Sequence, residues 1–388
     1  MKKLCYGISV VAMLMANRSV MSIHLPDELR YNETTWLVTH NATSFGTNLW
    51  DIKDMLDRLI DPVYFIPIYG QIELGKKLTR MLEQVTRFNL SADQHHSLEQ
   101  QYANGIHAFK IPIHTYGDTT PMIMHTQSYN ERDILLRWIE HNVTGKTLPF
   151  RKILEDKATF ILQHIDRTRI PLHQFLTRVV QLLEQDPEAI ITLFSDVHIA
   201  PEAQRNFIRA FYESGAYNYL HIQAENQPWP LLGTLRKTNK RLITFFDEKF
   251  SEELLAEFPW ARGLHGTNRF IAANHWTFES LEKLISDSGS IGSVGVDRAM
   301  ALYLMYHFVT PRIAPNIPGI SGSAPIARVA NSYPVLNVTI DKFRNKNGKT
   351  PNFIAVDFYD ENYPDLRNIV DQINFATFSS IRAYPKIK

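Results

Sequence analysis

Eight short apolar segments, most of them separated by stretches of helical periodicity, constrain the fold of this 388-residue chain. Several are continuous apolar runs, such as AIITLF at 189–194 and NFIAV at 352–356. Such runs are typical of parallel strands that are covered on both faces. The predicted strands are 36–40, 106–113, 121–125, 189–195, 241–247, 269–274, 302–308 and 352–358.

The segments between these strands favour a barrel. Residues 171–185 place Leu172, Phe175 and Val179 on one helical stripe, which stops at Asp186. Helical patterns also cover 202–214, 251–258, 277–286 and 364–376. Only the second and third strands are joined without a helix. The sequence therefore predicts a single-domain α/β fold, an irregular (β/α)8 TIM-type barrel.

Composition allows a large core and argues against two classes of protein. Hydrophobic residues make up 44% of the chain, and the formal net charge is only +1 without a basic run. A general nucleic-acid binder is therefore not expected. No apolar run after the first residues has the length of a transmembrane helix, so none is predicted.

The amino-terminal residues resemble an export signal. Two lysines precede a short apolar run at 4–15, and small residues follow as far as Ser22. This pattern predicts a signal peptide at 1–22 and a mature domain at 23–388, secreted or periplasmic, although an ordinary first strand or helix would also fit. The only cysteine, Cys5, lies inside the signal, so the mature protein would have no disulfide.

A long insertion separates the first two strands. Residues 49–90 begin where the first strand would open into the active-site mouth, and they contain the apolar, aromatic stretch 63–69. Two interpretations remain open, an interfacial lid that docks on a membrane and an extra segment that packs on the barrel. Residues 286–300 and 311–327 are rich in Gly, Ser and Pro and predict loops.

Polar side chains gather where the strands end. Chemistry in a barrel of this type lies at the carboxyl ends of its strands. One such residue is more often a cap than a catalyst, but the coincidence of many predicts an active site. Two histidines and a buried carboxylate suit general acid–base catalysis at a phosphorus or acyl centre. The candidates are His40, Asn41, Lys110, His125, Asp196, Asp247, His275, His307 and Asp357.

Other chemistries have weaker support in the sequence. It contains no G-x-S-x-G elbow, no H-E-x-x-H and no G-x-x-x-x-G-K-[ST] phosphate loop. A metal cluster of His40, His125, His275 and His307 stays open as an alternative, but no short ligand pair such as H-x-H supports it.

Four segments resemble the X domain of phosphatidylinositol-specific phospholipase C, especially its small secreted and bacterial single-domain members. WLVTHN (36–41) and MIMHTQ (122–127) are similar to the two histidine motifs of that family. QQYANGIHAFKIPIH (100–114) resembles its second strand, and PNFIAVDFYDENYPDLRNIVDQIN (351–374) resembles its last strand and helix. The resemblance covers about residues 35–376.

The resemblance implies a reaction and roles for residues. The inositol 2-hydroxyl attacks the adjacent phosphodiester, which releases diacylglycerol and leaves a cyclic inositol phosphate. His40 would be the general base, His125 the general acid, and Asp357 would orient His40. The expected partners are an inositol lipid and a phospholipid membrane surface. Expected substrate contacts are Asn41, Asp196, Asp247, His275 and His307.

The second strand departs from the family pattern. Family members stabilise the phosphate with calcium, held partly by two acids on this strand, or with an arginine there. The matching positions are Lys110 and Pro112, so no calcium site and no other cofactor are expected. The Lys110 ammonium would replace them as a point charge. Alternatively, Lys110 merely neutralises Asp357 or Asp196 in a weakened site.

Three functions remain open from the sequence. The first is an exported, metal-independent phosphodiesterase–lyase that acts on phosphatidylinositol or a related inositol lipid. The second is the same barrel acting on another phosphodiester or a sphingolipid. The third is a catalytically weak lipid-binding protein that has kept both histidines.

Overall fold

The computed structural model describes eleven stretches and two single residues of the chain. They are residues 25–40, 42, 94, 96–115, 119–123, 170–199, 201–224, 227–246, 250–264, 270–275, 278–292, 297–310 and 324–383. The predicted signal peptide and all of the 49–90 insertion lie outside them, as do Asn41, His125 and Asp247. Within these residues, no helix combines the length and apolarity needed to cross a bilayer.

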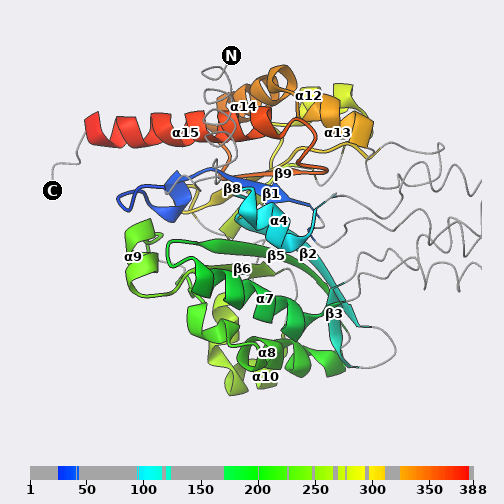
Figure 1. Cartoon of the computed structure of the whole chain (residues 1–388), viewed down its shortest axis with the longest axis vertical. Helices are drawn as coiled ribbons and strands as arrows, with labels where there is room; N and C mark the ends of the chain where they lie inside the picture. The colour runs from blue at the N-terminus through cyan, green and yellow to red at the C-terminus, as the bar shows by residue number, and fades with distance from the viewer. Residues whose placement is uncertain are drawn as a thin grey trace, which may run out of the picture.

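In the part of the chain that the structure describes, seven parallel strands form the main sheet, in the order β7-β8-β9-β1-β2-β5-β6 (Figure 1). The first and last strands of the chain therefore lie side by side, with the register Thr39↔Val356. This arrangement confirms the predicted α/β barrel-like fold. The seven strands are β1 (Trp36–Thr39), β2 (Ala108–Thr115), β5 (Ile191–His198), β6 (Leu242–Phe246), β7 (Ile271–Ala273), β8 (Leu302–Tyr306) and β9 (Phe353–Val356).

The third predicted strand exists but is not a barrel strand. β3 (Pro121–Ile123) runs antiparallel to the carboxyl end of β2, and β4 (Ile170–Pro171) runs antiparallel to β3. A short connection without a helix can only reverse the chain direction, which explains this hairpin.

Among the described residues the barrel is open between β6 and β7, because no strand pairing joins them. Trp229 lies at this seam, with its ring centroid 6.2 Å from that of Phe245 on β6 and 5.7 Å from that of Phe270, next to β7. Aromatic packing here takes the place of a backbone ladder.

Helices cover the outside of the curled sheet. α7, α8 and α10 lie against the half that contains β5 and β6, and α12 to α15 lie against the half with β8 and β9 (Figure 1). Helical patterns in the sequence predicted α7 (Leu172–Gln185), α8 (Gln204–Glu213), α10 (Glu252–Glu257), α12 (Leu281–Asp287) and α15 (Tyr363–Ala383). They missed α4 (Leu98–Ala103), α9 (Leu232–Lys237), α13 (Ala324–Ala330) and α14 (Tyr333–Asn347). α13 begins inside a segment that had been predicted as a loop.

Strand alternation divides the apolar residues into two layers. Val38, Ala108, Phe194 and Phe353 belong to the cluster inside the barrel, whereas their neighbours along each strand pack under the helices. Successive side chains of a strand point to opposite faces. The same alternation decides which polar residues at the strand ends point into the barrel mouth.

Candidate active site

His40 and Asp357 form a buried pair at the carboxyl ends of β1 and β9. Each residue directly follows its strand, and the register of the strands places the two side by side. His40 Nδ1 lies 2.7 Å from Asp357 Oδ1, and the two residues are 5% and 2% exposed. When Nδ1–H donates to the carboxylate, Nε2 is the nitrogen that can accept a proton.

The backbone around the pair is tied down. The amide N of His40 donates to the carbonyl of Val356 at 3.0 Å. Gln94 Nε2 donates to the carbonyls of His40 (2.9 Å) and Val356 (3.1 Å), so one side chain joins the ends of both strands. Gln94 is fully buried. The imidazole and the carboxylate are therefore presented by a rigid frame.

The turn after β9 is strained in a way that fixes Asp357. Phe358 has a φ of 42°, in the left-handed region that non-glycine residues rarely adopt. Asn331 Nδ2 donates to the carbonyls of Asp357 (3.1 Å) and Phe358 (3.3 Å) and so supports this conformation. Strained backbone of this kind is often found at functional sites.

Lys110 also points into the barrel mouth. It shares the interior face of β2 with Ala108, is only 1% exposed, and forms an ion pair with Asp196 Oδ2 of β5. The Lys110 carbonyl accepts a hydrogen bond of 2.9 Å from the amide of Ala42, just after His40. The register of β1 and β2 places this buried ion pair beside the His40 pair.

This position does not suit calcium. An ammonium cannot be a calcium ligand and would repel a cation. In the part of the chain that the structure describes, no three His, Cys, Asp or Glu side chains are grouped closely enough to hold a metal ion.

A comparison with known protein families identifies the family to which this chain belongs. The model described as PI-PLC X 1 matches residues 163–368, more than half of the chain. The chain belongs to the PI-PLC X family. The matched region contains Asp196 and Asp357, whereas His40 and Lys110 precede it.

Solved structures of bacterial members can be superposed on this family member over most of its length. The phosphatidylinositol-specific phospholipase C from Listeria monocytogenes is 12% identical, with 90% of this chain and 96% of that chain covered and a TM-score of 0.48. The F249X mutant of the Staphylococcus aureus enzyme is 13% identical, with 89% and 95% covered and a TM-score of 0.48. These superpositions are too loose to assign residue roles. No curated protein matches this sequence.

His307 lies outside the mouth of this PI-PLC X-family barrel. Strand alternation turns it toward the helices, where it is fully buried and its Nε2–H donates to the carbonyl of Ala330 at 2.8 Å. Burial lowers its pKa from 6.5 to about 4, because the charged form would lose its hydration. A neutral, enclosed imidazole has no access to substrate, so the predicted substrate contact is replaced by a structural role.

The remaining predicted residues divide into two groups. His275 follows β7, is exposed, and shares the strand face of Ile271 and Ala273, which contact the barrel interior. Asn41, His125 and Asp247 lie outside the described residues, so their roles stay predictions.

Two residues of the site were missed by sequence reasoning. Phe308 occupies the interior position next to His307, and its ring stacks on His40. The alternation of side chains along β8 could have indicated that Phe308 faces the barrel interior. For Gln94, an isolated polar residue between predicted elements, no sequence signal existed.

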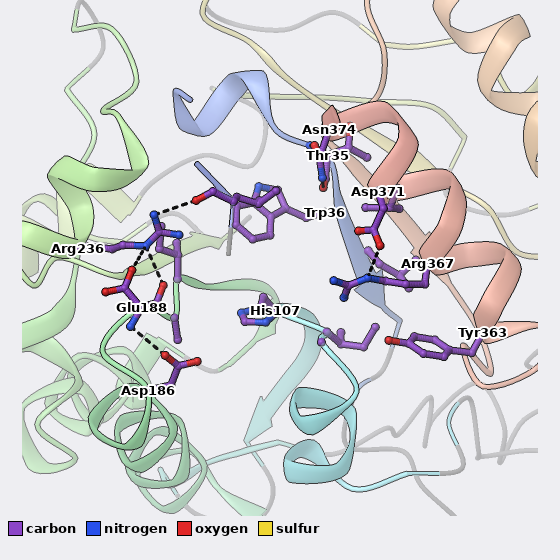
Figure 2. A pocket seen from close by; sticks show the side chains of 17 residues that line it. Thr35, Trp36, His107, Asp186, Glu188, Arg236, Tyr363, Arg367, Asp371 and Asn374 are labelled. Atoms are coloured by element: carbon purple, nitrogen blue, oxygen red, sulfur yellow. Dashed lines mark hydrogen bonds and ion pairs between the residues drawn. The ribbon is translucent and has the colours of Figure 1, made fainter. Parts of the chain in front are cut away.

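A separate cavity, whose lining is drawn in Figure 2, lies at the amino ends of the strands, opposite to the end that carries His40. It encloses about 690 Å³, including space open to solvent, and Trp36 and His107 line it at the amino ends of β1 and β2. The charged side chains that line the cavity pair with one another. Arg236 Nε lies 3.1 Å from Glu188 Oε2, and Arg367 Nε donates to Asp371 at 2.9 Å. The amino-terminal end of such a barrel usually serves stability, and these pairs fit that role.

Proposed function

We propose that this family member is a phosphodiesterase–lyase that cleaves phosphatidylinositol or a related inositol phospholipid to diacylglycerol and a cyclic inositol phosphate. The observation that carries the proposal is the buried His40–Asp357 pair at the carboxyl ends of adjacent strands. Family membership supports the same reaction. A histidine oriented by a carboxylate is the arrangement that general base catalysis requires.

Each proton in the proposed reaction has a defined place. His40 Nε2 takes the proton of the inositol 2-hydroxyl while that oxygen forms a bond to phosphorus. The bond from phosphorus to the glycerol oxygen breaks, and this oxygen takes a proton from His125. Asp357 stabilises the imidazolium that His40 becomes. Base and acid act on opposite sides of phosphorus, because in-line displacement places the entering and leaving oxygens there.

Lys110 supplies the positive charge in this proposal. Negative charge grows on the phosphate oxygens in the transition state, and a fixed cation lowers its energy. The ion pair with Asp196 also favours a second candidate, because an ammonium already neutralised by a carboxylate attracts phosphate less. That candidate is a lipid-binding protein with little turnover. An otherwise similar enzyme for another phosphodiester or a sphingolipid is the remaining alternative.

Substrate contacts and location complete the proposal. Asn41, Asp196, Asp247 and His275 would meet the inositol hydroxyls or the phosphate. Export by the signal peptide 1–22 would bring the protein to a secreted or periplasmic location, where it meets a membrane. One of the superposed structures concerns the modulation of membrane binding by the Staphylococcus aureus enzyme.

The interfacial lid is tested on vesicles. Replacing Tyr64, Phe65 and Tyr69 by Ser should weaken vesicle binding and leave activity on a soluble substrate unchanged. Equal losses of both would instead indicate that the 49–90 insertion packs against the barrel.

The decisive experiment measures release of diacylglycerol and cyclic inositol phosphate from phosphatidylinositol vesicles. Wild type, His40→Ala and the control His173→Ala on α7 are compared with and without a chelator. We expect His40→Ala to lose at least about 100-fold in rate, with no effect of the control or the chelator. Equal rates for wild type and His40→Ala would refute the proposal, and vesicle binding without product would favour the lipid-binding alternative.

A further inference from the structure

The ring of Phe308 lies flat against the imidazole of His40. The two centroids are 4.2 Å apart and the planes differ by 10°. Both residues are enclosed, with Phe308 2% and His40 5% exposed. One face of the imidazole is therefore covered by an aromatic ring while its Nδ1 edge is held by Asp357.

Three contacts hold Phe308 in this position. The edge of Tyr306, two residues earlier on β8, packs on it at 5.7 Å and 80°. The amide of His307 donates to the carbonyl of Ala355 at 2.8 Å, and its ring is anchored to Ala330 on the outer side. The amide of Thr310 donates to the carbonyl of Phe278 at 2.8 Å. β8 continues in this way beside β9, so Phe308 reaches across to β1.

We propose that Phe308 is a positioning residue for His40, an inference that rests on the proposed function. The hydrogen bond at Nδ1 holds one edge of the imidazole and does not by itself fix the plane of its ring. A flat ring against its face fixes that plane, and with it the direction in which Nε2 takes the proton. The electron-rich face of Phe308 also attracts the imidazolium that forms in the transition state.

Kinetics separate positioning from simple packing. Phe308→Leu keeps most of the apolar volume but removes the flat face, so we expect kcat to fall about tenfold with KM within about twofold. Phe308→Tyr keeps the ring and should retain kcat within about threefold of wild type. Phe308→Met replaces the Leu variant if that variant does not fold. An unchanged kcat in Phe308→Leu, or an equal loss in Phe308→Tyr, would overturn the proposal.

A spectroscopic readout does not depend on turnover. In protein labelled at histidine, the ring protons of His40, assigned with His40→Gln, should be shifted upfield by the stacked ring in wild type and in Phe308→Tyr. In Phe308→Leu this shift should disappear, and the nitrogen signals should show a mixture of tautomers. Unchanged His40 signals in Phe308→Leu would refute positioning. If wild type releases no product while the signals change as expected, the proposed reaction fails and the positioning role stands.

Discussion

Replacing Asp357 by Asn tests the orientation of His40 with the smallest change of shape. The carboxylate accepts a hydrogen bond from Nδ1–H at 2.7 Å, and the pair is almost fully buried. An Asn side chain can present its NH2 to Nδ1, which moves the imidazole proton to Nε2 and removes the base. The imidazolium formed in the transition state also loses its counter-charge.

The expected loss is large enough to separate orientation from destabilisation. We expect kcat to fall by about 10²–10⁴, which corresponds to roughly 3–5 kcal/mol of transition-state stabilisation. Loss of a buried, charge-assisted hydrogen bond should lower the free energy of unfolding by about 1.5–3 kcal/mol. The fold then remains populated while the reaction stops.

The assay is release of cyclic inositol phosphate from phosphatidylinositol vesicles, together with urea unfolding. Asp341→Asn is a matched control, because Asp341 on α14 is exposed and pairs with Arg344 in the same helix. It should change stability by no more than about 0.5 kcal/mol and leave the rate unchanged. A kcat for Asp357→Asn within threefold of wild type would refute the role that we assign to Asp357.

Three further perturbations address the charge, the core and the far end of the barrel. Lys110→Met should lower turnover at least about tenfold relative to wild type, both alone and when Asp196 is also replaced by Asn. An unchanged rate would show that the ammonium takes no part in the reaction. His307 has a folded pKa of about 4 against 6.5 in the unfolded chain, so stability should fall by up to roughly 3 kcal/mol as pH decreases from 6.5 to 4. Urea unfolding of His307→Gln should show a pH dependence that is smaller by this amount, and an unchanged pH dependence would contradict the assignment. Gly105→Ala should destabilise more than Gly215→Ala in thermal unfolding, since both have positive φ but only the former Cβ would meet the Arg367 guanidinium; equal losses would contradict this packing.

The alternation of side chains along β8 explains why the predicted substrate contact of His307 is wrong. The run LYLMYHF is apolar on both faces because the strand is covered inside and outside, so the sequence alone does not reveal which residues face the barrel interior. Strand positions were predictable, since several of the apolar runs are continuous and bounded by breakers. The direction of the side chain after β8 was not, and so Phe308 was overlooked in favour of a titratable neighbour.

The long helix α14 was missed for a different reason. Its sequence YPVLNVTIDKFRNKN is rich in β-branched residues, which have low intrinsic helix propensity. Only Leu336, Thr339, Ile340 and Phe343 are buried, at the spacing of one helical stripe. Packing of Phe343 on Tyr303 of β8, and of the helix on α12 and α15, stabilises a helix that local propensity alone does not specify.

The pairing of β1 with β9 has a consequence for when activity can appear. His40 and Asp357 are 317 positions apart in the sequence, yet β9 lies between β1 and β8 in the sheet. A chain growing from its amino terminus carries the proposed base long before the carboxylate exists. Every partial chain therefore lacks the His40–Asp357 pair, which forms only when β9 enters the middle of the sheet.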